Sequence, residues 1–532
     1  MNFSADSIPY GQTNSFSQII LDYLDNVPQL REFYNYRPDN EGIANAVKDR
    51  QNFPVNRQLL ADMLQKQYAD IPISDKLKDN IDALREENCF TICTAHQPNI
   101  FTGHLYFIYK ILHAIRLSNE LNETMKGNKF VPVFYMGSED ADLDELGEVT
   151  INGKFYRWQT KQSGAVGRMK IDKAFIKLID EIESRLSVEE YGAAMMQAVR
   201  SAYSENKTIE KATFDFVHEL FNEFGLVILL PDRNEFKNEF AGVIRKELSE
   251  QFSHEAVSKT VAAFPAAYKV QAVGRAMNLF YLEGSSRERI EKAGEGFTIA
   301  NTRLTFTASS LEEILQSSPE KFSPNVILRP VFQEMILPDV VFIGGGGELA
   351  YWLELKDLFG IAGAYFPVLV LRNSFGILTH KTVGKIKALG LTNAELFKSE
   401  NLLLEELVKK ESLVQLSLDD EIGQLQIFYD NIKTVAAGVD HTLSGHAHAL
   451  GVQAVNRLEK LEKKMLKAEK KKFEAQQRQI RKIKTAVSPG GVLQERVDNI
   501  LEYTAVYGPG FLQMLYKHSS PYPVGFTVLK EE

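Results

Sequence analysis

The first stretch of this sequence that could carry chemistry is Thr94–Leu105, which follows an apolar, β-rich run at 90–94 and opens a helix that continues through Leu117. The free N–H groups and positive dipole of a helix start favour an anion. Gly103 permits close backbone approach, and His96 and His104 can donate to anionic oxygens. The stretch predicts a phosphate or carboxylate site, with simple packing of both histidines as the alternative.

A second polar stretch follows the apolar run at 130–136 and holds four carboxylates within six residues. Such a cluster suits a substrate ammonium or Mg²⁺. The spacing fails as a calcium-binding EF-hand loop, because Glu145 stands where that loop needs glycine. A solvated acidic turn is the alternative interpretation. The four carboxylates are Glu139, Asp140, Asp142 and Asp144.

A third stretch runs from Leu328 to Trp352 and contains Arg329, an apolar run and four successive glycines at 344–347. A glycine loop between a strand and a helix can cradle an anion. The dinucleotide fingerprint is excluded, because Glu348 puts a carboxylate at the helix start, where it would repel pyrophosphate. Glu348 can instead cap the helix or orient an amine, and Arg329 offers bidentate contact to a carboxylate.

These stretches need a common scaffold, and the apolar runs supply one. Two strands that flank one helix make a βαβ unit with a parallel sheet. We predict an open, doubly wound α/β fold with a Rossmann-like parallel sheet, which binds ligands at the carboxyl ends of its strands. The core spans 89–375, with insertions at about 150–220 and 235–325, after a helical lead-in at 1–88. The strands are expected at 90–94, 130–136, 226–230, 340–343 and 368–371.

The C-terminal part, 376–532, is predicted to be helical. A helix at about 421–437 ends at Gly438, and Asp440 is a good N-cap for a single helix from His441 to about Thr485. Leu458, Leu461, Met465 and Ala468 keep coiled-coil spacing, so this long helix must pair with another helix or subunit. An aromatic tail follows Pro489-Gly490-Gly491 and is expected to dock onto the body.

Composition excludes several classes of protein. Of 532 residues, 44% are hydrophobic and 25% charged, which is ordinary globular usage. The net charge is −9 and the basic residues gather in one helix, so we expect no nucleic-acid partner. No uncharged apolar run approaches about 18 residues, which predicts no membrane association and a cytoplasmic location. Cys89 and Cys93 are expected to be buried packing residues.

Several blocks in this order, followed by a coiled coil, resemble the bacillithiol biosynthesis cysteine-adding enzyme family, whose members are described as cysteine ligases. The resemblance covers the chain from about Thr91 to the C-terminus. The blocks are Phe101–Tyr106 with Tyr109-Lys110, Glu139-Asp140, Leu328-Arg329-Pro330 with Leu337-Pro338, Gly344–Glu348 with Tyr351-Trp352, Arg478–Lys482 and Leu493–Arg496.

Membership would imply amide-bond formation between L-cysteine and glucosaminyl-malate. It would also imply a Rossmann-type core with connecting-peptide insertions, a coiled coil, homodimerisation and an adenine nucleotide (ATP or ADP). The chain departs from the family pattern at several positions. Ala95-His96-Gln97 replaces glycine-glutamine-glutamine, Ala141 replaces histidine, and His104 and Gly346 replace prolines.

The resemblance and the residue chemistry together assign roles. His96, Asn99 and His104 would hold the activated carboxyl group. Glu139, Asp140 and Asp142 would bind an ammonium or act as base, and Arg329 and Arg372 would grip the malate carboxylates. No residue is assigned as a metal ligand. The remaining substrate contacts are assigned to Gln97, Gly103, Tyr106, Gln333, Gly345, Gly346, Glu348, Tyr351, Trp352 and Asn373.

Two other functions remain open at this point. Phe101-Thr102-Gly103-His104 resembles the His-x-Gly-His motif of class I aminoacyl-tRNA synthetases with its first histidine missing, which favours a nucleotidyl or aminoacyl transferase acting on another amine. Thr379–Thr382 is at best a remnant of the partner motif of those enzymes. The long basic helix would also suit a non-enzymatic coiled-coil assembly protein.

Overall fold

The computed structural model describes residues 2–271 and 274–532. The chain forms two compact units, Met1–Gly376 with Leu493–Leu529, and Ile377–Val492 with Lys530–Glu532. Residues 493–529 therefore group with the N-terminal unit, so the helical region expected at 376–532 is divided between the two units.

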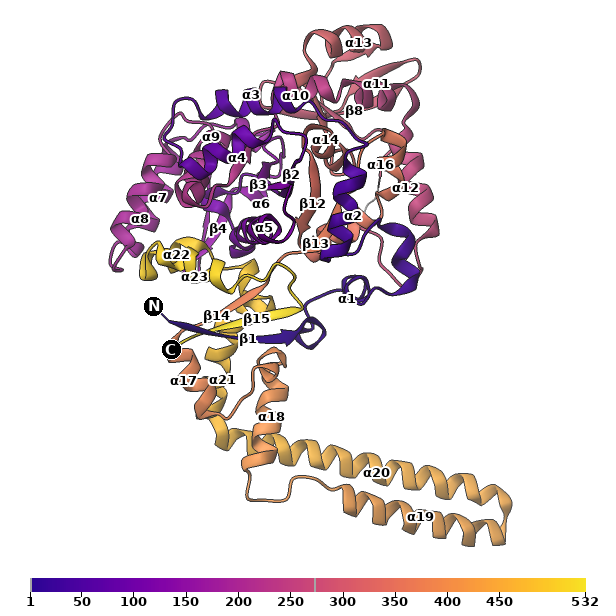
Figure 1. Cartoon of the computed structure of the whole chain (residues 1–532). Coiled ribbons are helices and arrows are strands. Elements are labelled where there is room, and N and C mark those ends of the chain that lie inside the picture. Colours follow the sequence, from indigo (N-terminus) through magenta and orange to yellow (C-terminus); the bar gives the residue numbers. More distant parts are fainter. Residues whose placement is uncertain (1, 272–273) are drawn as a thin grey trace. The chain divides into compact units, whose positions relative to one another are not determined.

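A five-stranded parallel sheet forms the centre of the first unit (Figure 1). Every neighbouring pair is parallel, and the spatial order is β13-β12-β2-β3-β6. This is a doubly wound order: successive strands are added on one side of β2 as far as β6, and then on its other side as β12 and β13. The predicted fold class is therefore confirmed. The strands are β2 (Cys89–His96), β3 (Lys129–Met136), β6 (Val227–Leu229), β12 (Asp339–Gly344) and β13 (Val368–Leu371).

Helices cover both faces of this sheet. On one face, apolar residues of α5 (Leu105–Thr124) and α2 (Asn40–Arg50) join a core with alternate residues of β2, such as Phe90 and Ile92. On the other face, Trp352 of α15 (Gly346–Leu353) stacks on Phe342, with ring centroids 4.1 Å apart. Trp352 is fully buried, so its assignment as a substrate contact is wrong.

The N-terminal segment is largely helical but begins with a strand that its pattern did not predict. β1 (Phe3–Pro9) belongs to a three-stranded sheet of order β1-β15-β14. β14 spans Phe375–Leu378 and β15 spans Gly525–Glu531. The other helices of the first unit outside the insertions are α1 (Gln18–Leu24), α3 (Arg57–Tyr68), α4 (Asp75–Ala83), α16 (Lys356–Ala362), α22 (Ile500–Tyr507) and α23 (Gly510–His518).

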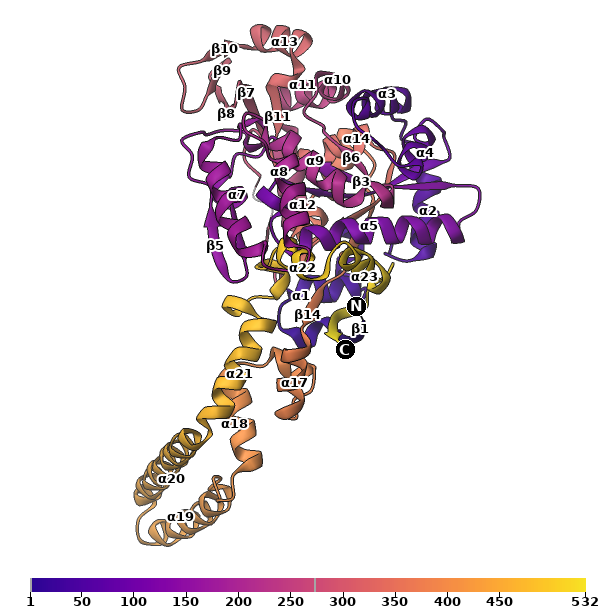
Figure 2. The same ribbon diagram turned by 90° about the vertical axis from the view of Figure 1, so that its left-hand side faces the viewer.

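Two insertions interrupt the Rossmann order close to the predicted positions. The first has α6 (Leu143–Leu146), β4 (Glu148–Ile151), β5 (Lys154–Arg157), α7 (Lys173–Leu186), α8 (Gly192–Ala202) and α9 (Ile209–Phe221). The second carries an antiparallel sheet of order β10-β9-β8-β7-β11, seen in Figure 2. Its elements are α10 (Asn234–Glu239), α11 (Ala241–Glu250), α12 (Phe252–Ala263), β7 (Leu279–Glu283), β8 (Ser286–Ala293), β9 (Gly296–Ile299), β10 (Thr305–Thr307), α13 (Ala308–Ser317) and β11 (Phe322–Pro324), followed by α14 (Arg329–Ile336).

The second unit is helical. Asp440 accepts a hydrogen bond from the Thr442 N–H at 2.8 Å, which confirms it as an N-cap. Gly438 lies inside α19 rather than ending it, and a 3₁₀ turn at Lys471–Phe473 interrupts the helix expected to run unbroken to Thr485. The helices are α17 (His380–Ala388), α18 (Glu400–Glu411), α19 (Asp419–Val439), α20 (His441–Lys470) and α21 (Glu474–Val487).

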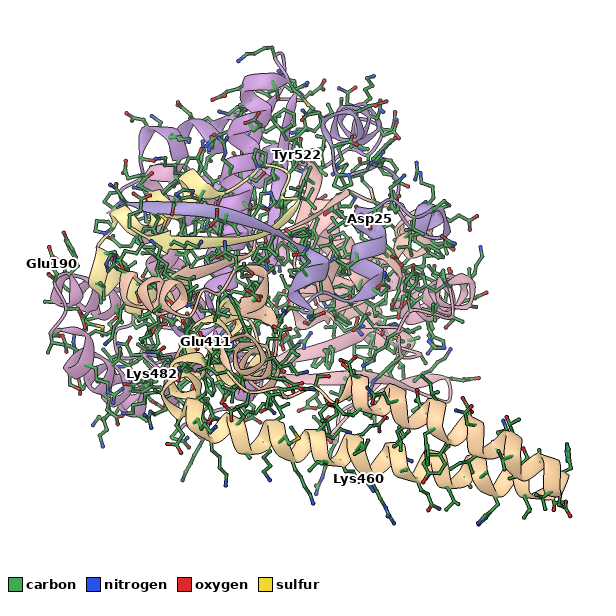
Figure 3. The ribbon with its side chains drawn as sticks, turned by 90° about the horizontal axis from the view of Figure 1, so that it is seen from below. Asp25, Glu190, Glu411, Lys460, Lys482 and Tyr522 are labelled. Atoms are coloured by element: carbon green, nitrogen blue, oxygen red, sulfur yellow. The ribbon has the colours of Figure 1, made fainter. Side chains whose placement is uncertain are left out.

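α19 and α20 form an antiparallel helical hairpin. Many of its side chains point outward from the two helices, as Lys460 does in Figure 3. Gly451 allows close approach, because a Cβ there would lie 2.9 Å from the Tyr429 Cβ. The predicted seam is only partly covered, since Leu461 is 47% exposed. No helix among residues 2–271 and 274–532 is long and apolar enough to cross a membrane.

The stacked position of Trp352 makes it a test of the sheet packing. Replacing Trp352 with alanine removes a fully buried indole and leaves a cavity, so we expect a loss of about 3–5 kcal/mol in unfolding free energy. Urea denaturation measures it. Phe155→Ala, at a 54% exposed position, should cost less than about 1 kcal/mol. Equal losses in the two variants would contradict this packing.

Candidate functional site

A cavity of about 460 Å³ lies at the carboxyl edge of the parallel sheet. Its walls come from the ends of β2 and β3, from α14 and α15, and from the antiparallel sheet of the second insertion. Seven of the predicted site residues line it. They are His96, Gln97, Glu139, Asp140, Arg329, Glu348 and Tyr351.

Lys110 and Glu348 form an ion pair beside this cavity. The Lys110 Nζ lies 2.5 Å from Glu348 Oε2 and also donates to the Ala95 carbonyl at 2.9 Å. The Gly345 N–H donates to the same Glu348 oxygen at 2.8 Å. Burial opposes ionisation of Glu348, but the Lys110 ammonium and these hydrogen bonds hold the pKa of its carboxyl below the usual value.

The carboxylate of Glu348 therefore occupies the position at the start of α15 where a bound anion would otherwise lie. Gly345 and Gly346 do not line the cavity, and a Cβ at Gly346 would lie 3.3 Å from the Ile20 side chain. The structure gives no support to their predicted ligand contacts, because the Glu348 carboxylate and the packing of α1 close the loop. Nothing in the residues around Lys110 indicates its ion pair with Glu348.

N–H groups at the start of α5 also have hydrogen-bond partners within the chain. The Leu105 N–H donates to the Asp498 carbonyl at 2.9 Å, and the Gly103 N–H donates to the Ile100 carbonyl at 3.0 Å. The His104 Nδ1 lies 3.3 Å from the Val497 carbonyl. The phosphate site predicted at this helix start is therefore not open in the structure, since chain carbonyls occupy these positions.

The loop before α5 is strained and buried. Phe101, Thr102 and Gly103 have φ of 51°, 68° and 63°, and Asn499 bonds the carbonyls of Phe101 and Gly103. Asn99 is 2% exposed and does not line the cavity. Asn99, Gly103 and His104 thus shape the loop, and their predicted direct contact with substrate is not supported.

His96 remains at the cavity as a neutral side chain. Its Nδ1 lies 3.1 Å from the Gln97 carbonyl. Burial and the nearby Lys110 ammonium lower the pKa of His96 to about 3. At neutral pH the imidazole is therefore uncharged, so it can exchange single hydrogen bonds with a ligand but is a poor acceptor of a full proton.

The acidic cluster separates into different roles. Glu139 pairs with the buried Lys237, and burial raises the pKa of its carboxyl. Asp140 accepts a hydrogen bond from Gln97 Nε2 at 3.0 Å. Asp142 is exposed, caps α6 by accepting from the Glu145 N–H and does not line the cavity, so the structure gives no support to its predicted catalytic role.

Three further predicted contacts do not line the cavity. Arg372 forms a buried ion pair with Glu495, with Nη2 and Oε1 2.6 Å apart, and its guanidinium stacks over Tyr106 at 5.3 Å from the ring centroid. Asn373 donates to the Ser520 carbonyl and accepts from the Ser520 N–H. Arg372 would have to leave its ion pair to grip malate, so the structure gives no support to the roles predicted for Arg372, Tyr106 and Asn373.

Arginines of the second insertion complete the cavity, and the sequence reasoning missed them. Arg287 lies 3.9 Å from the Phe280 ring centroid and donates to Ser323 Oγ and the Pro324 carbonyl. Arg275 and Arg289 also line the cavity, on the same side as Arg287. The period-two placement of Arg287 and Arg289 in one strand was the signal that could have found them.

A larger cavity of about 1020 Å³ lies between α3, α8, α9 and α10, next to the carboxyl end of β6. Its basic groups are largely neutralised by neighbours. Lys207 and Lys211 both pair with Asp215, and Arg233 pairs with Glu210. The smaller cavity is therefore the better candidate for an anionic substrate.

Comparison with known proteins gives the family. Residues 3–373 match the model of the N-terminal Rossmann-like domain of bacillithiol biosynthesis BshC, and residues 375–531 match its C-terminal coiled-coil domain. The chain belongs to the BshC family. The resemblance and the fold class inferred from the sequence are thereby confirmed.

Three relatives match over nearly their whole length, and each is named "Putative cysteine ligase BshC". The one from Cytophaga hutchinsonii is 35% identical over 98% of this chain and 97% of its own. The one from Flavobacterium psychrophilum is 34% identical over 99% of both chains. The one from Flavobacterium johnsoniae is 35% identical over 98% of this chain and 99% of its own.

Among solved structures, an arginyl-tRNA synthetase from Campylobacter jejuni, titled as putative, aligns with 85% of this chain and 100% of its own. Its identity is 9% and its TM-score is 0.25, which is too low to support an argument.

The Lys110–Glu348 pair predicts a large stability effect. Lys110→Met leaves Glu348 as a buried, unpaired charge, so we expect a loss of about 3–5 kcal/mol in unfolding free energy. Adding Glu348→Gln should restore part of it, because a neutral amide can still cap α15. Lys126→Met, at an exposed lysine, is the control. Losses that simply add in the double variant would contradict the pairing.

Proposed function

We propose that this protein is a cysteine ligase that joins L-cysteine to glucosaminyl-malate through an amide bond, forming bacillithiol. The observation that carries the proposal is the cavity itself, which is lined by three arginines of the second insertion, here called the arginine wall, together with Arg329 and the carboxylates of Glu139, Asp140 and Glu348. The three arginines are Arg275, Arg287 and Arg289. The full-length relatives named as cysteine ligases support it.

The arginine wall suits the malate end of the substrate. Malate carries two carboxylates, and guanidinium groups bind carboxylates through paired, charge-assisted hydrogen bonds. Arg287 is held against Phe280 and faces the cavity, while Arg329 faces it from α14. We assign one malate carboxylate to Arg287 with Arg289 and the other to Arg329.

The carboxylates suit the amine groups. Asp140, which Gln97 orients, is assigned to the ammonium of L-cysteine. The cysteine carboxyl group would first have to be activated by a nucleoside triphosphate, for example as an acyl phosphate, because an amine does not displace hydroxide. Attack by the glucosamine amine would then form the C–N bond, break the bond from the carbonyl carbon to the phosphate leaving group and release a proton, which requires a base. Glu139 is assigned as that base, because burial raises the pKa of its carboxyl and Lys237 holds it in place. His96 is assigned to a hydrogen bond with the reacting carboxyl group.

An adenine nucleotide, which the family resemblance implies, does not fit the helix start after Gly103 that was expected to hold its phosphates, and the start of α15 does not offer a second place for them. Glu348 occupies the start of α15, and the Asp498 carbonyl occupies the start of α5. We therefore assign no step of the reaction to a nucleotide at these positions.

Homodimerisation through the coiled coil is part of the proposal. Helix α19 exposes four large apolar side chains. Ile427, Phe428, Val435 and Val439 are 65%, 57%, 73% and 79% exposed. Burying such side chains against a second copy would remove apolar surface from water, at roughly 25 cal/mol per Å².

Arg287 provides the main test of the substrate assignment. Arg287→Ala should raise the KM for glucosaminyl-malate at least about tenfold, since one charge-assisted contact is worth about 1.5–3 kcal/mol. The KM for L-cysteine should stay within about twofold. Arg303→Ala, at an exposed arginine of the same insertion, is the control. Steady-state kinetics of the full chain measures both values, and an unchanged KM for glucosaminyl-malate would overturn the assignment.

The dimer has its own test. Phe428→Glu should weaken self-association at least about tenfold, because a charge replaces an apolar contact. Sedimentation equilibrium of the full chain measures it. Gln426→Glu, at an exposed position of the same helix, should leave self-association unchanged. A wild-type chain that sediments as a monomer would refute the proposal.

A further inference from the structure

A chain of hydrogen bonds runs from the cavity into the protein interior through α14. Arg329 Nη2 donates to the Tyr351 hydroxyl and its Nη1 donates to Gln333 Oε1, both at 3.2 Å. Gln333 Nε2 in turn donates to Glu334 Oε1 at 2.9 Å. Gln333 is fully buried and does not line the cavity, so its predicted direct contact with substrate is replaced by a contact with Arg329.

The chain ends on two buried carboxyl groups. Glu334 and Asp339 are 1% and 0% exposed, and each carboxylate would raise the pKa of the other by repulsion. Glu334 Oε2 and Asp339 Oδ2 are buried and accept no hydrogen bond from another described group, so a proton between the two carboxyl groups would satisfy both oxygens. Asp339 Oδ1 accepts from the Thr91 hydroxyl at 3.1 Å. A register shift between β12 and β2 directly after Asp339 places it opposite Thr91. A bond between two carboxyl groups requires one proton between them.

The remaining charged and titratable groups around the pair come from four elements. Arg50 of α2 donates to the carbonyls of Glu334 and Leu337 and is the facing cation. Arg329 faces the pair from α14, Cys93 from β2, and Tyr365 from the segment before β13. Arg329 also contacts Tyr351 and Gln333 at the cavity, so Arg50 is the cation whose hydrogen bonds lie beside the carboxyl pair, and one net negative charge on the pair balances it.

The state of Glu334 decides how the Gln333 amide is turned. A carboxylate only accepts hydrogen bonds, so it attracts the amide NH₂ group and leaves Oε1 facing the guanidinium, which only donates. With the shared proton on Asp339, Glu334 stays an acceptor. An amide turned the other way would point its NH₂ group at Arg329 and push the guanidinium out of place.

We propose that Gln333, Glu334 and Asp339 are positioning residues. They fix the guanidinium of Arg329 in the cavity through one relay, and the two carboxyl groups share a single proton. The consequence for malate binding rests on the proposed function, but the position of Arg329 and the shared proton do not.

The first experiment removes the middle of the relay. Gln333→Leu keeps the volume and deletes both hydrogen bonds. We expect a crystal structure of the variant to show the Arg329 guanidinium displaced or without a fixed position, and calorimetry to show about tenfold weaker binding of glucosaminyl-malate. Gln316→Leu, the same substitution at an exposed position of α13, is the matched control. It should leave the position of Arg329 unchanged and bind glucosaminyl-malate within about twofold of wild type.

An unmoved Arg329 in Gln333→Leu would overturn the relay. If the wild-type chain fails to bind glucosaminyl-malate, the proposed function falls, while the crystal structure still decides the relay. If Gln333→Leu does not fold, Gln333→Met, which keeps a flexible side chain of similar length, replaces it in both measurements.

The second experiment tests the shared proton. Burial raises the pKa of Asp339 well above its usual value. Because the folded chain binds the shared proton more tightly than the unfolded chain, the contribution of this proton to stability is complete below the unfolded carboxyl pKa and declines as pH rises toward the raised pKa. Urea unfolding of wild type between pH 5 and pH 8 should show this decline. Asp339→Asn should show a smaller one, and an identical decline would contradict proton sharing.

Discussion

The ammonium of Lys110 lies where the strand order of the parallel sheet reverses, and it joins three elements there. It donates a hydrogen bond to the Ala95 carbonyl near the end of β2 and forms an ion pair with Glu348 at the start of α15. Its own helix, α5, packs on β2 and β3. An unpaired buried ammonium or carboxylate is costly, so neither partner can leave without the other being neutralised. At the crevice that a doubly wound sheet offers, an internal ion pair therefore forms part of the cavity wall, and the second insertion supplies the opposite part.

The insertions are held at that cavity by charge as well as by apolar packing. Lys237 of the second insertion pairs with Glu139 after β3 and donates to the Phe322 carbonyl. Arg168 of the first insertion pairs with Asp232, with Nε and Oδ2 2.8 Å apart. These contacts bring the antiparallel sheet, and with it Arg287 and Arg289, over the carboxyl ends of β2 and β3. The Rossmann core therefore supplies the carboxylates and Arg329, and the insertion supplies the other cations.

The sequence predicted those features that depend on local pattern. The five apolar runs became the five parallel strands, and Asp440 became an N-cap, because burial on both sheet faces and capping both leave a signature in neighbouring residues. Tyr351 and Trp352 could have been separated in the same way. Adjacent residues on a helix point about 100° apart, so only one of the two could face the cavity.

Features that depend on distant partners could not be predicted. Nothing near Arg372 indicates that Glu495 neutralises it, and nothing near Gly103 indicates that the Asp498 carbonyl and Asn499 close the loop. The break at Lys471–Phe473 has no proline or glycine to mark it. The central claim is that this chain adds L-cysteine to glucosaminyl-malate, and its most direct test is thiol-labelled metabolite analysis of cells that lack the protein. The account predicts loss of bacillithiol with accumulation of glucosaminyl-malate, both reversed when the intact protein is restored; unchanged bacillithiol would contradict it.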